Sequence, residues 1–79
     1  MATENFTRTE TISLVEWTGS NLNEIVTFAG SANLSYVNGV LAIHGATVVV
    51  TNVVVKNEDG SFREVTTRAK IADDEFTEV

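Results

Sequence analysis

Carboxylates are the only side chains of this sequence that gather in numbers large enough to suggest a site. Six of them form two groups: Glu58 and Asp59, and Asp73, Asp74, Glu75 and Glu78. Oxygen-rich clusters can hold Ca²⁺ or Mg²⁺, but the ligand spacing of an EF-hand loop is absent. A solvated hairpin tip and a solvated tail explain the two groups more simply, so we expect no metal and no other cofactor. Exposed carboxylates can also recognise a basic protein surface.

The other reactive side chains do not form a recognisable catalytic pattern. His44 is the only histidine, and its neighbour Gly45 indicates a half-exposed turn. No nucleophile with a third orienting group can be identified around this histidine. Arg63, Arg68 and Lys70 could meet phosphates, but the glycines are isolated and form no phosphate-binding loop. The sequence therefore predicts a protein that is not an enzyme.

The composition limits the partners and the compartment. Eleven acidic residues face five basic ones among 79 residues, which gives a net charge of −6. This charge disfavours direct binding to nucleic acid or to an anionic membrane, both of which need basic groups. No apolar run approaches the ~20 residues that cross a bilayer, and the start of the chain lacks a signal-peptide pattern. The chain has no cysteine, which fits a reducing cytoplasm.

A small α+β domain over residues 9–79 must position these groups, after a flexible N-terminal arm at residues 1–8. Residues 9–17 predict a strand. Its apolar residues stand at both odd and even positions, which indicates that both faces of the strand are buried or that a bulge lies near Val15. Trp17 ends this strand, where it can either complete the core or serve as an exposed interface anchor.

A turn at residues 18–19 then leads into one short helix, at about residues 21–29. Ser20 or Asn21 can cap this helix, and Glu24 follows Asn21 at a capping-box spacing. Gly30 fits the left-handed position that ends a helix. The apolar stripe of the helix consists of Leu22, Ile25, Val26 and Ala29.

Residues 34–43 predict a hairpin, because Asn38-Gly39 suits a type I′ turn. In that register Val37 pairs with Val40. The core face of the hairpin then carries Leu34, Tyr36, Leu41 and Ile43, and the other face carries Ser35, Val37, Val40 and Ala42.

The rest of the chain predicts further antiparallel strands, giving a twisted sheet of about five strands. Residues 47–56 form a valine-rich strand buried on both faces, unless Asn52 marks a bulge or a turn that splits it. Residues 57–60 form a hairpin loop, and residues 61–68 return as a strand. Residues 71–79 form a short strand or helical turn anchored by Ile71, Phe76 and Val79. One short helix cannot cover the valine strand, so we expect a homo-oligomer.

The segment from Glu16 to Gly30 resembles a family of small, mostly uncharacterised proteins of tailed bacteriophages. The shared pattern is an aromatic-Thr-Gly at residues 17–19, Asn-Leu at 21–22, Glu-Ile at 24–25 and aromatic-x-Gly at 28–30. Looser matches lie at residues 51–56, 58–62 and 76–79. This chain lacks the basic-Pro start that commonly precedes the first strand of the family. The resemblance implies a phage origin and a small α+β fold, and it implies no reaction.

Composition and resemblance together favour a small acidic, non-enzymatic phage protein that binds a host or phage protein. We expect it to act in the host cytoplasm and to inhibit or modulate a host or defence factor. Its binding groups would be Trp17, Glu58, Asp59, Asp73, Asp74, Glu75 and Glu78. A virion accessory or decoration protein is the alternative. An oligomeric protein that sequesters a nucleotide between subunits is the second alternative.

Overall fold

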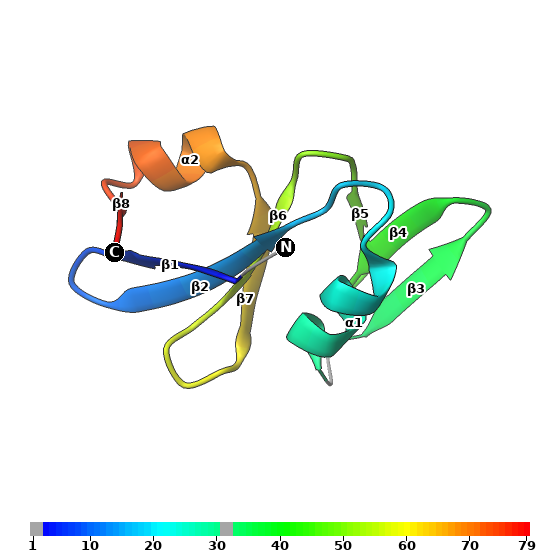
Figure 1. Cartoon of the computed structure of the whole chain (residues 1–79), viewed down its shortest axis with the longest axis horizontal. Coiled ribbons are helices and arrows are strands. Elements are labelled where there is room, and N and C mark those ends of the chain that lie inside the picture. Colours follow the sequence, from blue (N-terminus) through cyan, green and yellow to red (C-terminus); the bar gives the residue numbers. More distant parts are fainter. Residues whose placement is uncertain (1–2, 31–32) are drawn as a thin grey trace.

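The computed structural model describes residues 3–30 and 33–79 as an α+β fold, which confirms the predicted fold class. Within these residues there are eight strands and two short helices, where the sequence predicts about five strands and one helix (Figure 1). In chain order they are β1 (Glu4–Thr7), β2 (Thr11–Glu16), α1 (Leu22–Ala29), β3 (Leu34–Val37), β4 (Val40–Ile43), β5 (Ala46–Val48), β6 (Val53–Lys56), β7 (Phe62–Thr66), α2 (Arg68–Asp73) and β8 (Thr77–Glu78).

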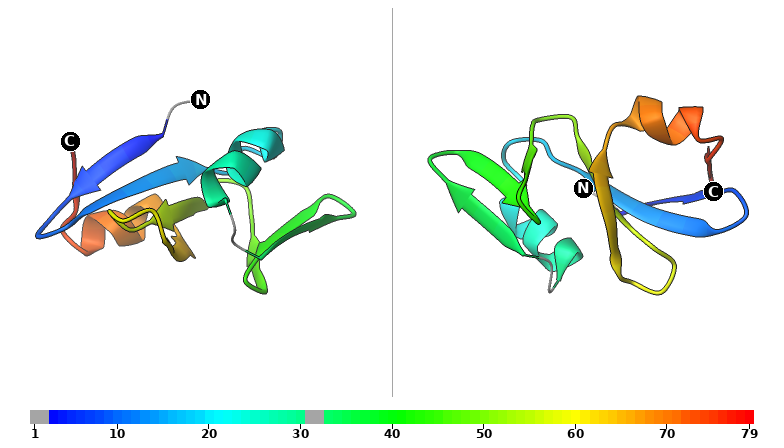
Figure 2. Two further views of the ribbon diagram at one scale, coloured as in Figure 1. Left: turned by 90° about the horizontal axis from the view of Figure 1, so that it is seen from below. Right: turned by 180° about the vertical axis from the view of Figure 1, so that it is seen from behind.

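The strands form two antiparallel sheets instead of one. The large sheet has the order β7-β6-β2-β1-β8, and the small sheet has the order β3-β4-β5. The small sheet and α1 lie together at one end of the molecule, and α2 and β8 lie at the other (Figures 1 and 2).

Part of the predicted arm, residues 1–8, belongs to the large sheet. Strand β1 pairs with β2 on one side and with β8 on the other. Phe6, the one apolar residue of β1, lies opposite Ile12 and packs against the core around Ile71. Partial burial of this side chain and pairing on both edges explain why residues 4–7 form a strand.

Strands β2 and β6 are central strands with apolar cover on both faces. One face, which we call the α1 core, packs against α1 and the small sheet and contains Val15, Trp17, Ile25, Phe28, Leu41, Ile43, Val48 and Val54. The other face, the α2 core, contains Ile12, Leu14, Val53, Val55, Ile71 and Phe76. The apolar residues at both odd and even positions of residues 9–17 therefore reflect burial of both strand faces, which is one of the two predicted explanations.

The predicted hairpin is confirmed in full register. Leu34 pairs with Ile43 and Val37 with Val40, and both turn residues have positive φ, 53° at Asn38 and 78° at Gly39. The prediction of the core face is confirmed except for Tyr36, which remains 43% exposed. His44 and Gly45 also have positive φ and form the turn that connects β4 to β5.

The valine-rich segment 47–56 is two strands, β5 and β6, joined by a turn. Asn52 makes this turn: its Oδ1 accepts from the Val49 N–H at 3.1 Å, and its own N–H donates to the Val49 carbonyl at 2.9 Å. The split by Asn52 is thus confirmed, and the continuous strand is wrong. Val49 and Val50 are more than half exposed in the turn.

Helix α1 lies where the sequence places it, although its cap and stripe differ in detail. The Asn21 side chain does not bond the helix N–H groups; its Oδ1 accepts from the Thr18 N–H at 2.9 Å, and its Nδ2 donates to Glu24 at 2.8 Å. Phe28 is buried in place of Val26, which is 45% exposed. The side chain of Asn21 therefore fixes the preceding turn rather than the helix end.

The C-terminal segment contains a second helix that begins earlier than expected. Thr67 caps α2, and its side-chain oxygen accepts from the Lys70 N–H at 3.2 Å. Ile71 and Phe76 are buried anchors as predicted, but Val79 is 80% exposed and anchors nothing. The N–H of Val79 instead donates to the Asn5 carbonyl at 2.9 Å.

Candidate functional site

The first carboxylate group, Glu58 and Asp59, lies in the loop between β6 and β7, and Asp59 is hydrogen-bonded within that loop. Asp59 Oδ1 accepts from the Ser61 hydroxyl at 2.6 Å and from the Ser61 N–H at 2.9 Å. These bonds lower the pKa of Asp59, because they favour the ionised carboxylate. Glu58 is exposed and takes part in neither bond. Of this pair, Glu58 is the one available to a partner.

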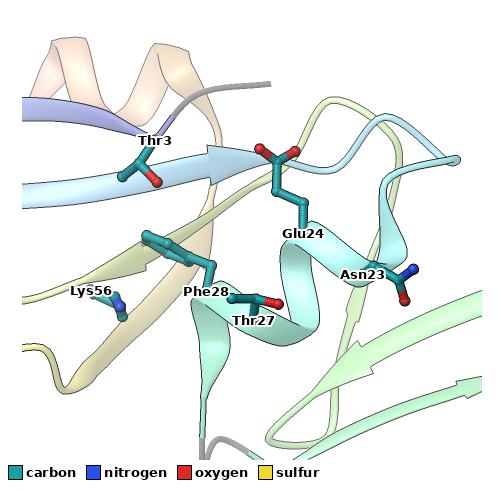
Figure 3. A pocket seen from close by; sticks show the side chains of 6 residues that line it. All are labelled: Thr3, Asn23, Glu24, Thr27, Phe28 and Lys56. Atoms are coloured by element: carbon teal, nitrogen blue, oxygen red, sulfur yellow. The ribbon is translucent and has the colours of Figure 1, made fainter.

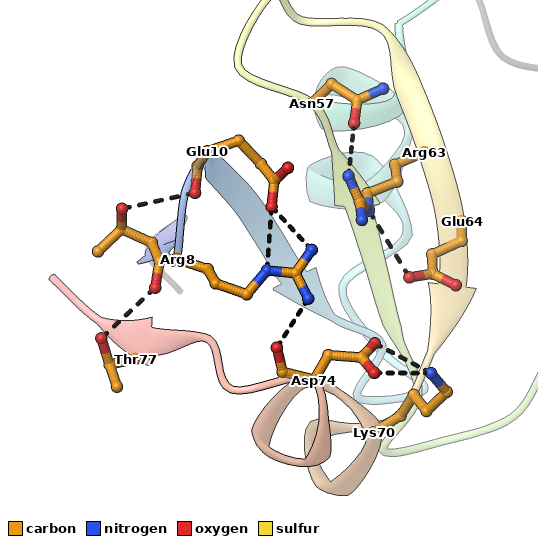
Figure 4. Close-up of polar contacts among 9 residues, drawn as sticks. Arg8, Glu10, Asn57, Arg63, Glu64, Lys70, Asp74 and Thr77 are labelled. Atoms are coloured by element: carbon orange, nitrogen blue, oxygen red, sulfur yellow. Dashed lines mark hydrogen bonds and ion pairs between the residues drawn. The ribbon is translucent and has the colours of Figure 1, made fainter.

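The second carboxylate group lies at the end of α2 and in β8, and one member is again bound internally. Lys70 Nζ donates to both carboxylate oxygens of Asp74, at 3.0 and 2.9 Å, and Arg8 Nη1 donates to the Asp74 carbonyl at 2.8 Å (Figure 4). Asp74 thus ties α2 to the β1–β2 turn. The other three, Asp73, Glu75 and Glu78, are exposed and form no ion pair with another described residue.

Both groups lie on the half of the molecule that holds α2 and β8 (Figures 1 and 2). Arg63 of β7 lies between them: its Nη1 donates to Asn57 Oδ1 at 3.1 Å, and its guanidinium carbon is 5.7 Å from the centre of the Phe76 ring. We call the exposed carboxylates that neither form an ion pair nor accept a hydrogen bond from another described residue the acidic end of the molecule; they are Glu58, Asp73, Glu75 and Glu78.

Four of the five basic side chains form their ion pairs with carboxylates outside the acidic end, and Lys70 also interacts electrostatically with Asp73. Arg68 joins three elements, its Nε donating to Glu16 of β2 at 2.8 Å and its Nη groups to Glu4 of β1. These bonds lower the pKa of Glu4 and raise that of Arg68. The remaining pairs are Arg8 with Glu10, Arg63 with Glu64 and Lys70 with Asp74.

The same ion pairs bear on the second alternative, in which basic residues would meet the phosphates of a nucleotide. Arg63, Arg68 and Lys70 are close in sequence, but each contacts its own carboxylate. A phosphate would have to displace these carboxylates, and their negative charge opposes its approach. The arrangement weakens the nucleotide-sequestering alternative.

Among the residues that the structure describes, Lys56 is the basic residue without a carboxylate partner, and it borders a groove beside α1. The groove, about 510 Å³ in volume, is lined by residues of α1, by Thr3 and by Lys56 (Figure 3). The Lys56 amine lies 4.4 Å from the centre of the Phe28 ring, a cation–π distance. A second hollow, about 400 Å³, adjoins it and includes His44, whose ring packs 4.6 Å from that of Phe62. His44 is therefore a turn residue whose ring packs against an aromatic side chain.

Trp17 belongs to the core. Only 3% of it is exposed, and its ring meets the Tyr36 ring edge to face with the centroids 6.0 Å apart. Its backbone N–H donates to Asn52, and its carbonyl accepts from Thr51. The sequence left two roles open for Trp17, and burial rules out the exposed interface anchor. Tyr36, which was predicted as core, is the aromatic side chain exposed at this place.

A second surface lies at the opposite end, where Glu24 is the one charged residue in the sequences of α1 and the small sheet. The sequence has no Asp, Glu, Lys or Arg between Glu24 and Lys56, and this stretch forms most of α1 and all of the small sheet. We call it the uncharged end. Its exposed large apolar side chains are Val26, Tyr36, Val37, Val40, Val49 and Val50. Sequence reasoning missed this surface, although the long stretch without charge was a signal for it.

No metal site or membrane-spanning helix is found in the part of the chain that the structure describes. In residues 3–30 and 33–79 no three histidine or acidic side chains converge closely enough to hold a metal ion. None of the helices there has the length and apolar character needed to cross a bilayer.

Comparisons with known proteins do not identify a relative of this chain. No family model matches it, and no curated protein or solved structure is significantly similar to it. The two ends must therefore be interpreted from their own chemistry.

Proposed function

We propose that this protein is a small, non-enzymatic phage protein that binds a basic surface of a partner protein and thereby inhibits or modulates it. The observation that carries the proposal is the distribution of charge. The basic residues are held in internal contacts, while Glu58, Asp73, Glu75 and Glu78 carry unpaired negative charge at one end. The phage origin and the host or phage partner rest on the resemblance of residues 16–30.

Unpaired carboxylates support binding because they attract a basic partner over a distance. Such steering raises the association rate and falls steeply as salt rises. A basic nucleic-acid site on a host or defence factor is the kind of surface that this end would block. The protein would then act by occupying the site, without any chemistry of its own.

The test is capture of partners by tagged protein from infected cells, at low and at high salt. We expect a basic protein to be captured at low salt and lost as salt rises. The variant Glu75→Gln/Glu78→Gln removes two unpaired charges from the acidic end and should capture much less. Val40→Lys/Val49→Lys changes the net charge equally at exposed positions of the other end, and should capture as the wild type does. Capture of nothing at low salt, or equal loss in both variants, would contradict the proposal.

The uncharged end favours one alternative, a role as an accessory component of the virion. Exposed valines and a small sheet with free edges suit self-association or assembly on another protein. Mass spectrometry of purified virions distinguishes the two roles. Absence of the protein from the particle would remove the virion role.

A further inference from the structure

Strand β3 offers a free backbone edge at the uncharged end of the molecule. Within residues 3–30 and 33–79 it pairs with β4 alone, and it lies at one side of the small sheet. In a hairpin with a two-residue loop, the residues that flank the loop exchange both backbone hydrogen bonds. Val37 and Ser35 therefore direct their backbone groups at β4, and the bond from the His44 N–H to the Asn33 carbonyl, 2.7 Å, continues that alternation. The backbone groups of Leu34 and Tyr36 consequently point away from the sheet.

None of the usual protective devices shields this edge. Free strand edges are normally protected by lysine or other charges, by proline, by a bulge or by very short length. Strand β3 has no charge and no proline, and its pairing with β4 has no register shift. Its side chains Tyr36 and Val37 are 43% and 63% exposed.

The other sheet edges are less suited to pairing. Strand β5 has three residues, and by the same alternation only Thr47 directs its backbone outward. Strand β7 carries Arg63 and Glu64, and β8 has two residues, one of them Glu78. Strand β3, with four residues, is thus the longest edge strand that carries no charge.

Charge also indicates which partner this edge would accept. Each molecule carries a net charge of −6, so two copies repel one another wherever their acidic surfaces meet. The uncharged end is the place where they can approach without bringing carboxylates together. Antiparallel pairing of a strand with itself about a twofold axis also needs no second sequence, since it is self-complementary.

We propose that two copies of this protein pair antiparallel through β3, about a twofold axis at Ser35, and form one continuous six-stranded sheet. In this register Leu34 lies opposite Tyr36 of the second copy, and Ser35 lies opposite Ser35. The outward backbone groups of Leu34 and Tyr36 in both copies then meet as hydrogen-bonded pairs. Tyr36, already packed on Trp17, gains an apolar neighbour across the strands. The acidic ends stay exposed, so this pairing is independent of the proposed function.

The absence of cysteine from the chain permits a direct test of the register. Ser35 lies at a non-hydrogen-bonded pair in the proposed dimer, where the Cα atoms are ~4.5 Å apart, within reach of a disulfide. Ser35→Cys should form a covalent dimer under mild oxidation at least about tenfold faster than Thr47→Cys, because pairing holds its thiols at a high effective concentration. Thr47 is the matched control, an exposed residue on β5 of the same sheet. Equal rates for the two variants would overturn the register.

A second variant tests the dimer without any covalent bond. Ser35 is exposed, so Ser35→Lys should leave the monomer folded, and it places two like charges at the twofold axis. We expect the wild type to sediment as a dimer that dissociates on dilution, and Ser35→Lys to sediment as a monomer with an unchanged circular dichroism spectrum. A wild type that stays monomeric at millimolar concentration, or a lysine variant that still dimerises, would overturn the proposal. Neither result depends on whether the acidic end captures a partner.

Discussion

Replacing a buried valine of β6 by threonine tests the cover on each face of the large sheet. Val54 and Val55 are both fully buried, but they point to opposite faces: Val54 to the α1 core and Val55 to the α2 core. Threonine keeps the β-branched shape and the strand preference of valine, and changes one methyl group to a hydroxyl. The effect of the substitution therefore reports on burial of a polar group rather than on shape.

We expect each substitution to lower the free energy of unfolding by about 1–3 kcal/mol, which is the usual effect of burying a hydroxyl without a partner. A chain of this length has a total stability of roughly 4–12 kcal/mol, so the loss is a large fraction of it. Each kcal/mol corresponds to a fall in Tm of roughly 4–8 °C. The same change at Val40, which is 52% exposed, should alter stability by less than about 0.5 kcal/mol.

The assay is urea unfolding followed by the fluorescence of Trp17, the single tryptophan, which is buried in the native state. The midpoints should shift with little change in the slope of free energy against urea. If Val54→Thr were as stable as Val40→Thr, the small sheet and α1 would not cover the large sheet. The same result at Val55→Thr would mean that α2 and Phe76 leave the other face open to water.

Three further predictions concern turns, ion pairs and caps. Gly39→Ala should destabilise by about 1–2 kcal/mol through its backbone alone, because φ is 78° and the added Cβ would meet no atom beyond the adjacent residues within 4 Å. Thermal unfolding measures this loss, and a neutral result would mean that the turn is not type I′. Arg68→Gln should destabilise by about 0.5–2 kcal/mol at neutral pH, since it breaks two partly exposed ion pairs. Arg68 lowers the pKa of Glu4 below 4.5, so its contribution is present above that pH and is lost as pH falls through the folded value; unfolding at a series of pH values should show the variant and the wild type converging in acid. Thr67→Ala removes the cap of α2 and should lower stability by about 0.5–2 kcal/mol, with Thr67→Ser as the variant that retains it.

Local signals in the sequence predicted the parts of the fold that depend on neighbouring residues. Asn38-Gly39 fixed the register of the β3–β4 hairpin, because positive φ at two successive positions admits few residues. Helix α1 was predicted from its apolar spacing and from Gly30, whose φ is 62°. The apolar residues at both odd and even positions of β2 and β6 correctly indicated strands that are buried on both faces.

The parts that were missed depend on residues far apart in the chain. Strand β1 exists because β2 and β8 pair with it, and no local pattern in residues 4–7 shows this. Helix α2 follows a cap at Thr67, but only six residues and one buried anchor, Ile71, mark it.

The candidate site was predicted in part. Of its carboxylates, Asp59 and Asp74 have internal partners, and these partners become visible only in three dimensions. Glu58, Asp73, Glu75 and Glu78 are exposed as expected. Trp17 could not be assigned from sequence, because the ring that packs on it, Tyr36, lies in the small sheet, beyond the intervening helix α1.

The pairing of β1 with β8 has a consequence for the order in which the protein folds. Phe6 lies opposite Glu78, so this pair joins nearly the whole length of the chain, whereas the two hairpins of the small sheet close over two residues each. Closing the longer loop costs roughly 3 kcal/mol more entropy by the logarithmic dependence on loop length. We therefore expect the middle of the chain to form first and its two ends to join last. In native-state hydrogen exchange the amide of Val79, which bonds Asn5, should exchange faster than the amides of β4, and slower exchange at Val79 would contradict this order.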